Sequence, residues 1–284
     1  MMGDLVRSFA AQLTHEMLHR WHRSLLASRA EMEDLGRYRT GDAPLQVVSG
    51  TVHSLRVHFE APPASGLDEQ MERFVRWFNR TVPDGDAPLP AVKRAGVAHL
   101  YFESIHPYED GNGRIGRAIS EKALGRPTLV ALAATIILRR KAYYRALEAA
   151  TGSNEITAWL RWFAGTAVEA QRRSRASVEF LIDKTKLLDR LRGQLNARQE
   201  QALLRVLREG PDGFAGGLST GNYVTITKVS SATARRDLAG LVSKGALTKT
   251  GKRRYTRYHL AIPTRTVQPV VVRASGDVKS VEPA

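Results

Sequence analysis

A stretch of twelve residues, from His106 to Arg117, constrains this chain more than any other. It combines an imidazole, two adjacent carboxylates, an asparagine between two glycines and two arginines three positions apart. Apolar residues recur at helical spacing on both sides of the stretch, so it is predicted to join two helices. The step Gly111-Asn112-Gly113 is predicted to open the second helix.

The residue types in this stretch suit a site that handles phosphate. Successive backbone N–H groups in a glycine-rich turn form an anion site, and the dipole of the following helix adds positive potential. Arg114 and Arg117 share a helix face and can fork onto further phosphate oxygens. Asp110 offers a hard oxygen ligand for Mg²⁺ that is also held by substrate phosphates. His106, with an ordinary pKa of about 6.5, is suited to accept a proton from an attacking hydroxyl, which indicates phosphoryl-type transfer.

Simpler interpretations of the stretch explain less. A hairpin turn at Asp110-Gly111 is disfavoured because the flanking residues have helical rather than alternating period. An EF-hand loop would need an oxygen ligand where Arg114 stands. A plain connector between helices accounts for the glycines, but it accounts for neither the histidine nor the spaced arginines.

The stretch closely resembles the signature of the Fic (Fido) family, His-Pro-Phe-x-(Asp/Glu)-Gly-Asn-Gly-Arg-x-x-Arg, with Tyr108 in place of the usual Phe. The resemblance implies a mainly α-helical fold and transfer of AMP from ATP to a Ser, Thr or Tyr hydroxyl of a target protein. It implies that His106 is the base and that Asp110 binds the cofactor Mg²⁺. The implied phosphate-binding residues are Gly111, Asn112, Gly113, Arg114, Gly116 and Arg117. If Tyr108 is buried as the Phe would be, its added hydroxyl needs a partner.

Residues 45–59 change to a pattern that predicts a β-hairpin ending at Pro62, with Val48 before a turn at Ser49-Gly50. Fic proteins carry such a hairpin, called the flap, at this place. An exposed strand edge can pair with an extended target segment without demanding a particular sequence. An exposed hairpin without any partner is the alternative interpretation.

Tyr143 and Tyr144 resemble the pair of residues that line the pocket for the nucleotide base in Fic proteins. The Asn often found seven residues after the second tyrosine is Thr151 here. Core packing is the alternative role for both tyrosines.

Residues 194–262 predict three short helices and a hairpin, an order that resembles a smaller winged helix-turn-helix (α/β) domain. The chain has a net charge of +15, and nine basic residues against one acidic residue lie between Lys228 and Tyr258. Such a basic region favours an anionic partner, so DNA is predicted, with docking onto a protein as the alternative. The predicted groove-facing residues are Ser231, Thr233, Arg235 and Arg236, and the predicted phosphate contacts are Lys252, Arg253 and Arg254.

Composition and pattern set the remaining boundaries. Residues 1–193 are predicted to form the catalytic domain, and residues 263–284 a disordered tail. The chain has no cysteine, which excludes disulfides and thiolate metal sites. Its longest apolar run is ten residues, against roughly 20 for a membrane span, and its first residues lack signal-peptide features. A cytoplasmic protein without a membrane partner is expected.

The sequence leaves alternatives open for the regulation of the protein and for the type of reaction. Many Fic enzymes carry an inhibitory (Ser/Thr)-x-x-x-Glu-(Gly/Asn) helix, whose closest counterpart here, Ser65 to Gln70, has the wrong last residue. Arg117 is therefore expected to be unrestrained, or restrained by an inhibitory segment or antitoxin-like partner in trans; a homodimer is a further partner considered. The predicted function is that of a protein adenylyltransferase. The alternatives are phosphate transfer, another nucleotide, removal of AMP, or a DNA-binding regulator whose Fic core senses nucleotides.

Overall fold

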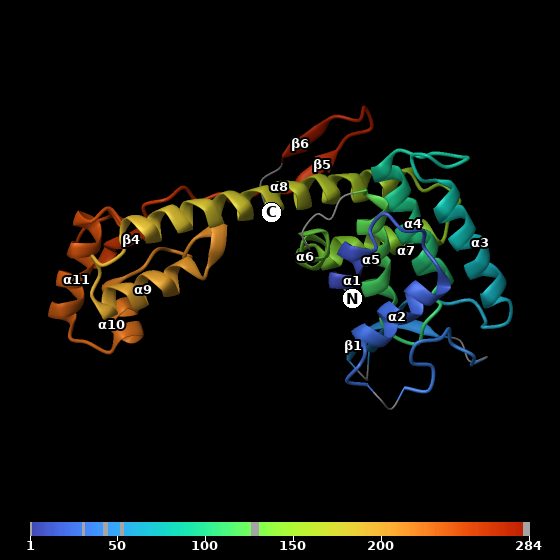
Figure 1. The fold of residues 1–284 in the computed structure, drawn as a ribbon, viewed down its shortest axis with the longest axis horizontal. Coiled ribbons are helices and arrows are strands. Elements are labelled where there is room, and N and C mark those ends of the chain that lie inside the picture. Colours follow the sequence, from blue (N-terminus) through green and yellow to red (C-terminus); the bar gives the residue numbers. More distant parts are fainter. Residues whose placement is uncertain (1, 30–31, 42–44, 52–53, 126–130, 281–284) are drawn as a thin grey trace. The chain divides into compact units, whose positions relative to one another are not determined.

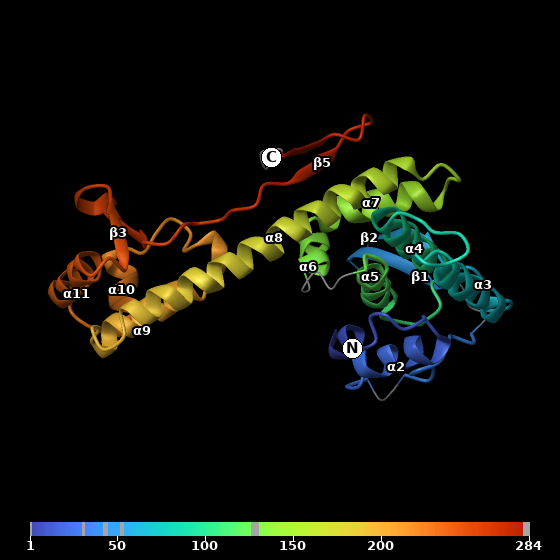
Figure 2. The same cartoon turned by 45° about the horizontal axis from the view of Figure 1, so that its top comes forward.

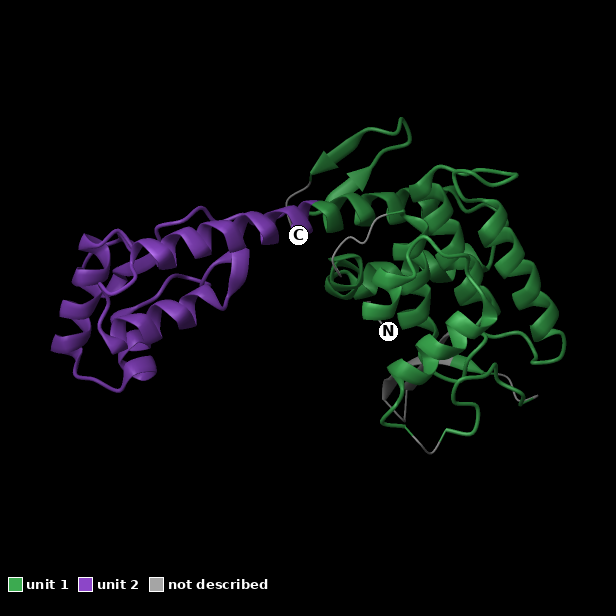
Figure 3. Cartoon of the chain, in the orientation of Figure 1, with its two compact units in different colours: residues 1–171, 268–284 green, residues 172–267 purple. Residues whose placement is uncertain are grey.

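The computed structural model describes residues 2–29, 32–41, 45–51, 54–125 and 131–280. The chain divides into two compact units, shown in Figure 3: unit 1 is Met1–Gln171 with Gln268–Ala284, and unit 2 is Arg172–Val267. The described residues are mainly helical and contain three two-stranded sheets. The predicted fold class, a helical core with a hairpin and a smaller winged-helix domain, is confirmed.

Unit 1 is organised around α5 (Asn112–Ala123), the helix that follows the glycine turn. Helices α1, α2, α4 and α6 all pack against it, as Figures 1 and 2 show from two directions. The other elements of the unit are α1 (Met2–Arg7), α2 (His15–Leu25), β1 (Gln46–Thr51), β2 (Ser54–Glu60), α3 (Leu67–Arg80), α4 (Ala91–Ile105), α6 (Ala131–Leu138), α7 (Arg140–Thr151) and the first part of α8 (Thr157–Arg190). The helices that enclose α5 thus hold the start of α5 in place.

The spacing of apolar residues explains why α3 packs on α4. Met71, Phe74, Val75 and Phe78 recur at helical spacing and are all buried, whereas the opposite face of the helix is charged. The ring of Phe74 meets the ring of Phe102 on α4 at 5.7 Å between centroids. This packing fixes the helix that leads into His106.

The flap is present as the antiparallel pair β1–β2, but its turn lies elsewhere than predicted. Val48 pairs with Val57, and the next two residues of β1 continue the ladder, so Ser49 and Gly50 are strand residues. Pairing runs on to Thr51 and Ser54, which means that the chain reverses after Thr51 and the predicted turn is wrong. Register over the whole hairpin, rather than one Ser-Gly step, decides where the reversal falls. Residues 52–53 and the side-chain exposure of residues 47–59 lie outside what the structure describes.

Unit 2 has the order of a winged helix. Its elements are the end of α8, α9 (Ala197–Leu207), the 3₁₀ turn η1 (Gly210–Asp212), α10 (Thr220–Thr227), α11 (Ser231–Ser243), β3 (Leu247–Thr250), the 3₁₀ turn η2 (Arg253–Tyr255) and β4 (Arg257–Leu260). Asn196 and Ser219 cap α9 and α10, each in a reciprocal capping box. The buried Asp237 accepts hydrogen bonds from Arg198 and Tyr223, which tie α11 to α9 and α10.

The two units meet within α8 and not near residue 193. Thr157–Arg190 is one continuous helix, and its later residues Phe180 and Leu187 are buried in the core of unit 2. Because one helix contributes residues to both hydrophobic cores, the amino-acid composition does not change at the boundary between the units. The predicted domain boundary at 193/194 therefore differs from the division at 171/172.

The C-terminal region differs more from its prediction. β5 (Val270–Val272) and β6 (Val278–Ser280) form a hairpin, so the predicted disorder is wrong for these residues. Val270 is buried, its N–H donates to Glu169 Oε2 at 3.3 Å, and its carbonyl accepts from Arg139 Nη1 at 3.3 Å. Arg139 and Glu169 also form an ion pair. These two side chains supply hydrogen-bond partners for the backbone of Val270. They stabilise a strand that the sequence pattern of this segment indicates only weakly.

Within the described ranges, no helix combines the length and the apolar character needed to cross a bilayer.

Candidate active site

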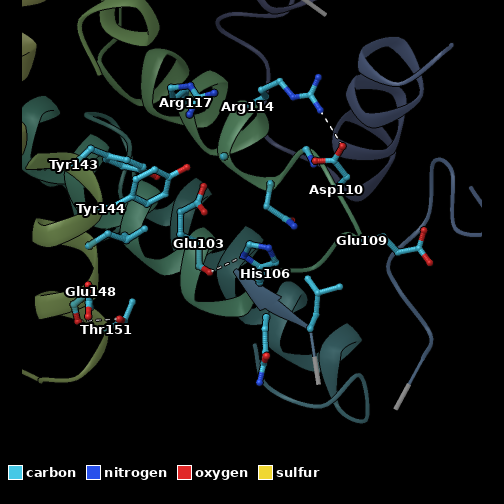
Figure 4. A pocket seen from close by; sticks show the side chains of 16 residues that line it. Glu103, His106, Glu109, Asp110, Arg114, Arg117, Tyr143, Tyr144, Glu148 and Thr151 are labelled. Carbon is cyan, nitrogen blue, oxygen red and sulfur yellow. Dashed lines mark hydrogen bonds and ion pairs between the residues drawn. The ribbon is translucent and has the colours of Figure 1, made fainter. Parts of the chain in front are cut away.

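The end of α4, the following loop, the start of α5 and one face of α7 line a cavity of about 370 Å³ in unit 1 (Figure 4). Gln46 of β1 adds the flap side of the wall. The cavity brings together most of the residues predicted from the motif and from the tyrosine pair, namely His106, Asp110, Gly111, Asn112, Gly113, Arg114, Arg117, Tyr143 and Tyr144.

His106 caps the end of α4 in a left-handed conformation, with φ of 51°. This conformation is costly for a residue with a Cβ and needs support from its surroundings. Its N–H donates to Phe102 O at 3.0 Å, and its carbonyl accepts from Arg39 Nε at 2.9 Å. The imidazole Nδ1 lies 3.3 Å from Glu103 O, so a proton on Nδ1 donates to that carbonyl. In this tautomer Nε2 carries the lone pair, as a general base requires.

Burial lowers the pKa of His106 to about 4. The nearby Arg39 cation acts in the same direction, whereas the bond to Glu103 O and the charge of Asp110 raise the pKa. Arg39 is itself buried, and its second guanidinium nitrogen donates to Pro62 O just beyond the flap. The imidazole is therefore neutral at pH 7, and Arg39 links the backbone carbonyl of His106 to the segment that follows the flap.

The glycine turn begins with Gly111, whose φ of 86° lies in the left-handed region that favours glycine. A Cβ at this position would also come 3.1 Å from Leu25 Cδ2 of α2. The N–H of Gly111 donates to the Asp110 carboxylate at 2.6 Å. The turn therefore packs closely on α2, and α5 begins at the wall of the cavity.

The side-chain amide of Asn112 is bound to the backbone of the loop. Its side-chain oxygen accepts from the Tyr108 N–H at 2.9 Å, and its side-chain nitrogen donates to the Tyr108 carbonyl at 2.6 Å. Only its backbone N–H remains as a contribution to the predicted anion site. The side chain therefore stabilises the loop geometry.

Tyr108 is fully buried, and its hydroxyl has the partner that the sequence requires. His19 Nδ1 lies 3.1 Å from the hydroxyl oxygen. The Tyr108 ring also stacks on His22, with centroids 4.1 Å apart and planes within 12°. His22 Nδ1 accepts from the Gly36 N–H, so its Nε2 carries the proton and donates to Asp110 O at 3.2 Å. A residue 88 positions away thus positions the backbone of Asp110.

The two arginines of the motif both line the cavity but have different surroundings. Figure 4 shows Arg114 turned towards Asp110, with its Nη2 3.2 Å from Oδ2. Arg117 lies on the other side of the turn and forms no ion pair within 4.0 Å with another side chain of the described ranges. Arg117 is thus the cation available for an anionic ligand.

Gly116 does not line the cavity, although the resemblance counts it with the phosphate-binding segment. A Cβ on this residue would come 2.8 Å from Glu103 Oε1 and 3.4 Å from His99. The glycine lets α5 approach α4 closely. Its role is therefore in packing.

Both tyrosines line the cavity, but Tyr143 also packs in the core of unit 1. Tyr143 is buried, and its hydroxyl lies 3.1 Å from His99 Nε2. Tyr144 is half-buried and, with Leu147 and Thr151, lines the far end of the cavity. This end also includes Glu148, and the ring of Tyr144 offers a face for a planar base.

Three residues that position or line the site were missed from the sequence. Glu103 lies one helical turn before His106 and faces the cavity, so helical spacing alone could have identified it. Arg39 and His22 reach the motif from positions 67 and 88 residues away, and no local pattern marks them.

A divalent cation fits the donor set without a protein cage. In the described part of the chain, no three His, Cys, Asp or Glu residues gather as a metal site. The half-exposed carboxylate of Asp110 is a hard oxygen ligand on the cavity wall. One carboxylate combined with ligand phosphates is how Mg²⁺ is usually bound.

In unit 2, the predicted DNA-contacting residues divide between one helix and one loop. Ser231, Arg235 and Arg236 are exposed on α11, and Thr233 is half-buried beside its cap Ser230. The remaining three, Lys252, Arg253 and Arg254, are exposed between β3 and β4.

Comparison with known families agrees with this geometry. Residues 12–124 match the Fic/DOC family. The chain carries a Fic domain. Residues 199–251 match the DeoR-like helix-turn-helix domain, so the Fic domain is followed by a helix-turn-helix in one chain. The family predicted from the motif is confirmed.

The curated relatives match over short segments of this chain. A probable protein adenylyltransferase of Aquifex aeolicus is 30% identical over 32% of this chain and 26% of its own length. The protein adenylyltransferase Fic of Drosophila melanogaster is 39% identical over 23% of this chain and 13% of its own length. Among solved structures, a Fic family protein from Desulfovibrio desulfuricans has a TM-score of 0.48 and 22% identity, covering 89% of this chain and 71% of that one.

Proposed function

We propose that this Fic chain transfers AMP from ATP to a hydroxyl side chain of a target protein. The proposal rests on one observation: a neutral imidazole shares a cavity with a glycine turn at a helix N-terminus. His106 lines this cavity together with Gly111, Gly113 and Arg117. The Fic family match and the adenylyltransferase relatives support the same reaction type.

In the proposed reaction, the target hydroxyl oxygen attacks the α-phosphorus of ATP in line with the leaving group. The bond from the α-phosphorus to the bridging oxygen breaks, and pyrophosphate leaves. The hydroxyl proton passes to Nε2 of His106, the nitrogen left as acceptor when Nδ1 donates to Glu103 O. Since burial keeps the imidazole neutral at pH 7, it is ready to accept this proton.

The phosphates would bind at the start of α5. The backbone N–H groups of Asn112 and Gly113 and the dipole of α5 would stabilise charge on the α-phosphate, whereas the N–H of Gly111 donates to Asp110. Arg114 and Arg117 would hold the β- and γ-phosphates, and Tyr144 would flank the base. Asp110 would hold Mg²⁺, which when bound supplies positive charge to the phosphates.

The flap would hold the target. Among the described residues, β1 and β2 form a sheet of two strands, so an edge is left on which an extended segment could add as a further strand. Gln46 at the start of β1 lines the same cavity as His106, which supports this role.

The test is transfer of label from α-³²P-ATP to proteins of a lysate, with mass spectrometry of a labelled target. We expect AMP on a hydroxyl residue in the wild type, no transfer by His106→Ala, and ATP binding retained by that variant. Addition of phosphate instead of AMP would replace this reaction with phosphotransfer. Equal labelling by His106→Ala and wild type would remove His106 from the mechanism.

A second function, DNA binding by unit 2, is supported by the DeoR-like match and by the exposed basic residues of α11 and the β3–β4 loop. α11 would enter the major groove with Arg235 and Arg236, and the loop would contact phosphates.

A further inference from the structure

Glu103 is a buried carboxyl in the wall of the candidate active site. It is 6% exposed and lies on the last turn of α4, three residues before His106. Its Oε1 is buried and has no hydrogen-bond partner among the described residues. A buried carboxyl oxygen without a partner is costly, which indicates that a ligand or a proton completes its surroundings.

The carboxyl lies between Gly116 and Gly113 of α5, next to the turn at which the proposed phosphates would bind. The point at which a Cβ of Gly113 would stand is 3.7 Å from Glu103 Oε1 and 3.3 Å from Arg117 Nη1. Glu103 and Arg117 therefore flank the same glycine of the turn. Figure 4 shows the carboxyl between His106 and Tyr144, on the cavity side of α4.

An ionised carboxylate in this place would repel a triphosphate, whereas a protonated one would donate a hydrogen bond to it. The groups around Glu103 are one cation, Arg117 on α5, and neutral rings, His99 and His106 on α4 and Tyr143 on α7. Of these groups, only Arg117 favours the ionised form of Glu103. A bound triphosphate would interact with the same cation.

We propose that Glu103 takes up a proton from solvent when a nucleoside triphosphate binds and then donates a hydrogen bond to a phosphate oxygen. This inference rests on the proposed function, because it requires ATP in the cavity. It assigns Glu103 a role as a ligand-binding residue that carries its proton only in the complex. The affinity for ATP then depends on pH through this one group.

The ionisation of the empty site agrees with this assignment. Burial raises the pKa of Glu103 to about 7, and the Arg117 cation opposes the rise. At pH 8 most of the empty protein is therefore ionised at Glu103. Binding of the negatively charged triphosphate raises the pKa further, so protonation accompanies binding.

The experiment is calorimetry of MgATP binding to the full chain at pH 8, in buffers with different heats of ionisation. The dependence of the binding heat on the buffer gives the number of protons taken up. We expect at least half a proton per ATP in the wild type and at least half a proton less in Glu103→Gln. Between pH 7 and 9 the wild-type affinity should fall by up to about tenfold per pH unit, while Glu103→Gln stays level.

Glu109→Gln is the matched control, because Glu109 lines the same cavity but is exposed. It should take up protons as the wild type does. Uptake below half a proton in the wild type would overturn the inference, whether or not Glu103→Gln folds. Equal uptake in wild type and Glu103→Gln would also overturn it, with the proposed function intact. No binding of ATP at any pH would overturn the proposed function and this inference with it.

Discussion

The side chain of Asn112 bridges both backbone polar groups of Tyr108, accepting from its N–H at 2.9 Å and donating to its carbonyl at 2.6 Å. This closed pair determines the path of the loop between His106 and α5. It also means that the asparagine between the two glycines acts through geometry and not through contact of its amide with a ligand.

Replacing Asn112 should therefore destabilise the protein as well as slow transfer. Asn112→Ala leaves two buried backbone groups without partners, and we expect a loss of about 2–4 kcal/mol in the free energy of unfolding. Urea denaturation measures this loss, with Asn154→Ala at an exposed position as control. A loss no larger than that of the control would show that the bridge does not hold the loop.

Tyr108→Phe tests the departure from the family signature. The change removes the hydroxyl that lies 3.1 Å from His19 Nδ1 but leaves the ring stacked on His22. We expect about 1 kcal/mol of lost stability and transfer activity within about twofold of the wild type. A large loss of activity at unchanged stability would mean that the hydroxyl has a role beyond packing.

Arg117 should act on ATP and not on the fold. It lines the cavity and forms no ion pair with the other described side chains, so its removal breaks no ion pair among them. Arg117→Ala should lower kcat/KM for ATP by about tenfold to hundredfold, since a charge-assisted contact to phosphate is lost. Arg145→Ala, exposed on α7, is the control. Equal kinetics in both variants would contradict phosphate binding by Arg117.

His99 should make the protein sensitive to acid. Burial lowers its pKa to about 4, with hydrogen-bond partners Ser120 and Tyr143 on its two nitrogens. The unfolded chain binds the proton near pH 6.5 and the folded chain only near pH 4. Stability is therefore full above pH 6.5 and falls as the pH drops towards 4.

His99→Gln should remove part of this dependence. We expect the loss of unfolding free energy between pH 7 and pH 4.5 to be smaller by roughly 2 kcal/mol than in the wild type. Denaturation curves at both pH values measure it. His106, whose pKa is also lowered by burial, remains in both proteins and cancels in the comparison. Identical pH dependence would show that His99 is not held neutral.

The basic residues of unit 2 should contribute to DNA binding through phosphate charge. Removing Lys252, Arg253 and Arg254 together should weaken binding to all sequences and reduce the slope of log affinity against log salt by about 0.9 per lost contact. Fluorescence anisotropy with duplex DNA at several salt concentrations measures both. Arg175→Ala, exposed on α8, should leave the slope unchanged. Absence of any DNA binding by the wild type would favour the docking alternative.

Residues close together in the sequence determined what could be predicted of the fold and of the motif. The glycine turn between helices, the caps Asn196 and Ser219, and the α3 stripe all follow from spacings of a few residues. Such local features depend on backbone geometry and helical period, which are the same in every fold. They sufficed for the fold class, the family and the residues of the cavity that come from the motif.

Only the tertiary structure decided how these residues are surrounded. The approach of Arg39 and His22 to the motif, the packing role of Gly116 and the buried carboxyl of Glu103 all depend on which helices face each other. The same holds for the C-terminal hairpin, whose Val270 is bound by side chains 101 and 131 positions earlier. Burial and charge act over distances in space, and a linear pattern does not contain those distances. The sequence therefore predicted the chemical groups of the site. The protonation and orientation of those groups were decided by packing.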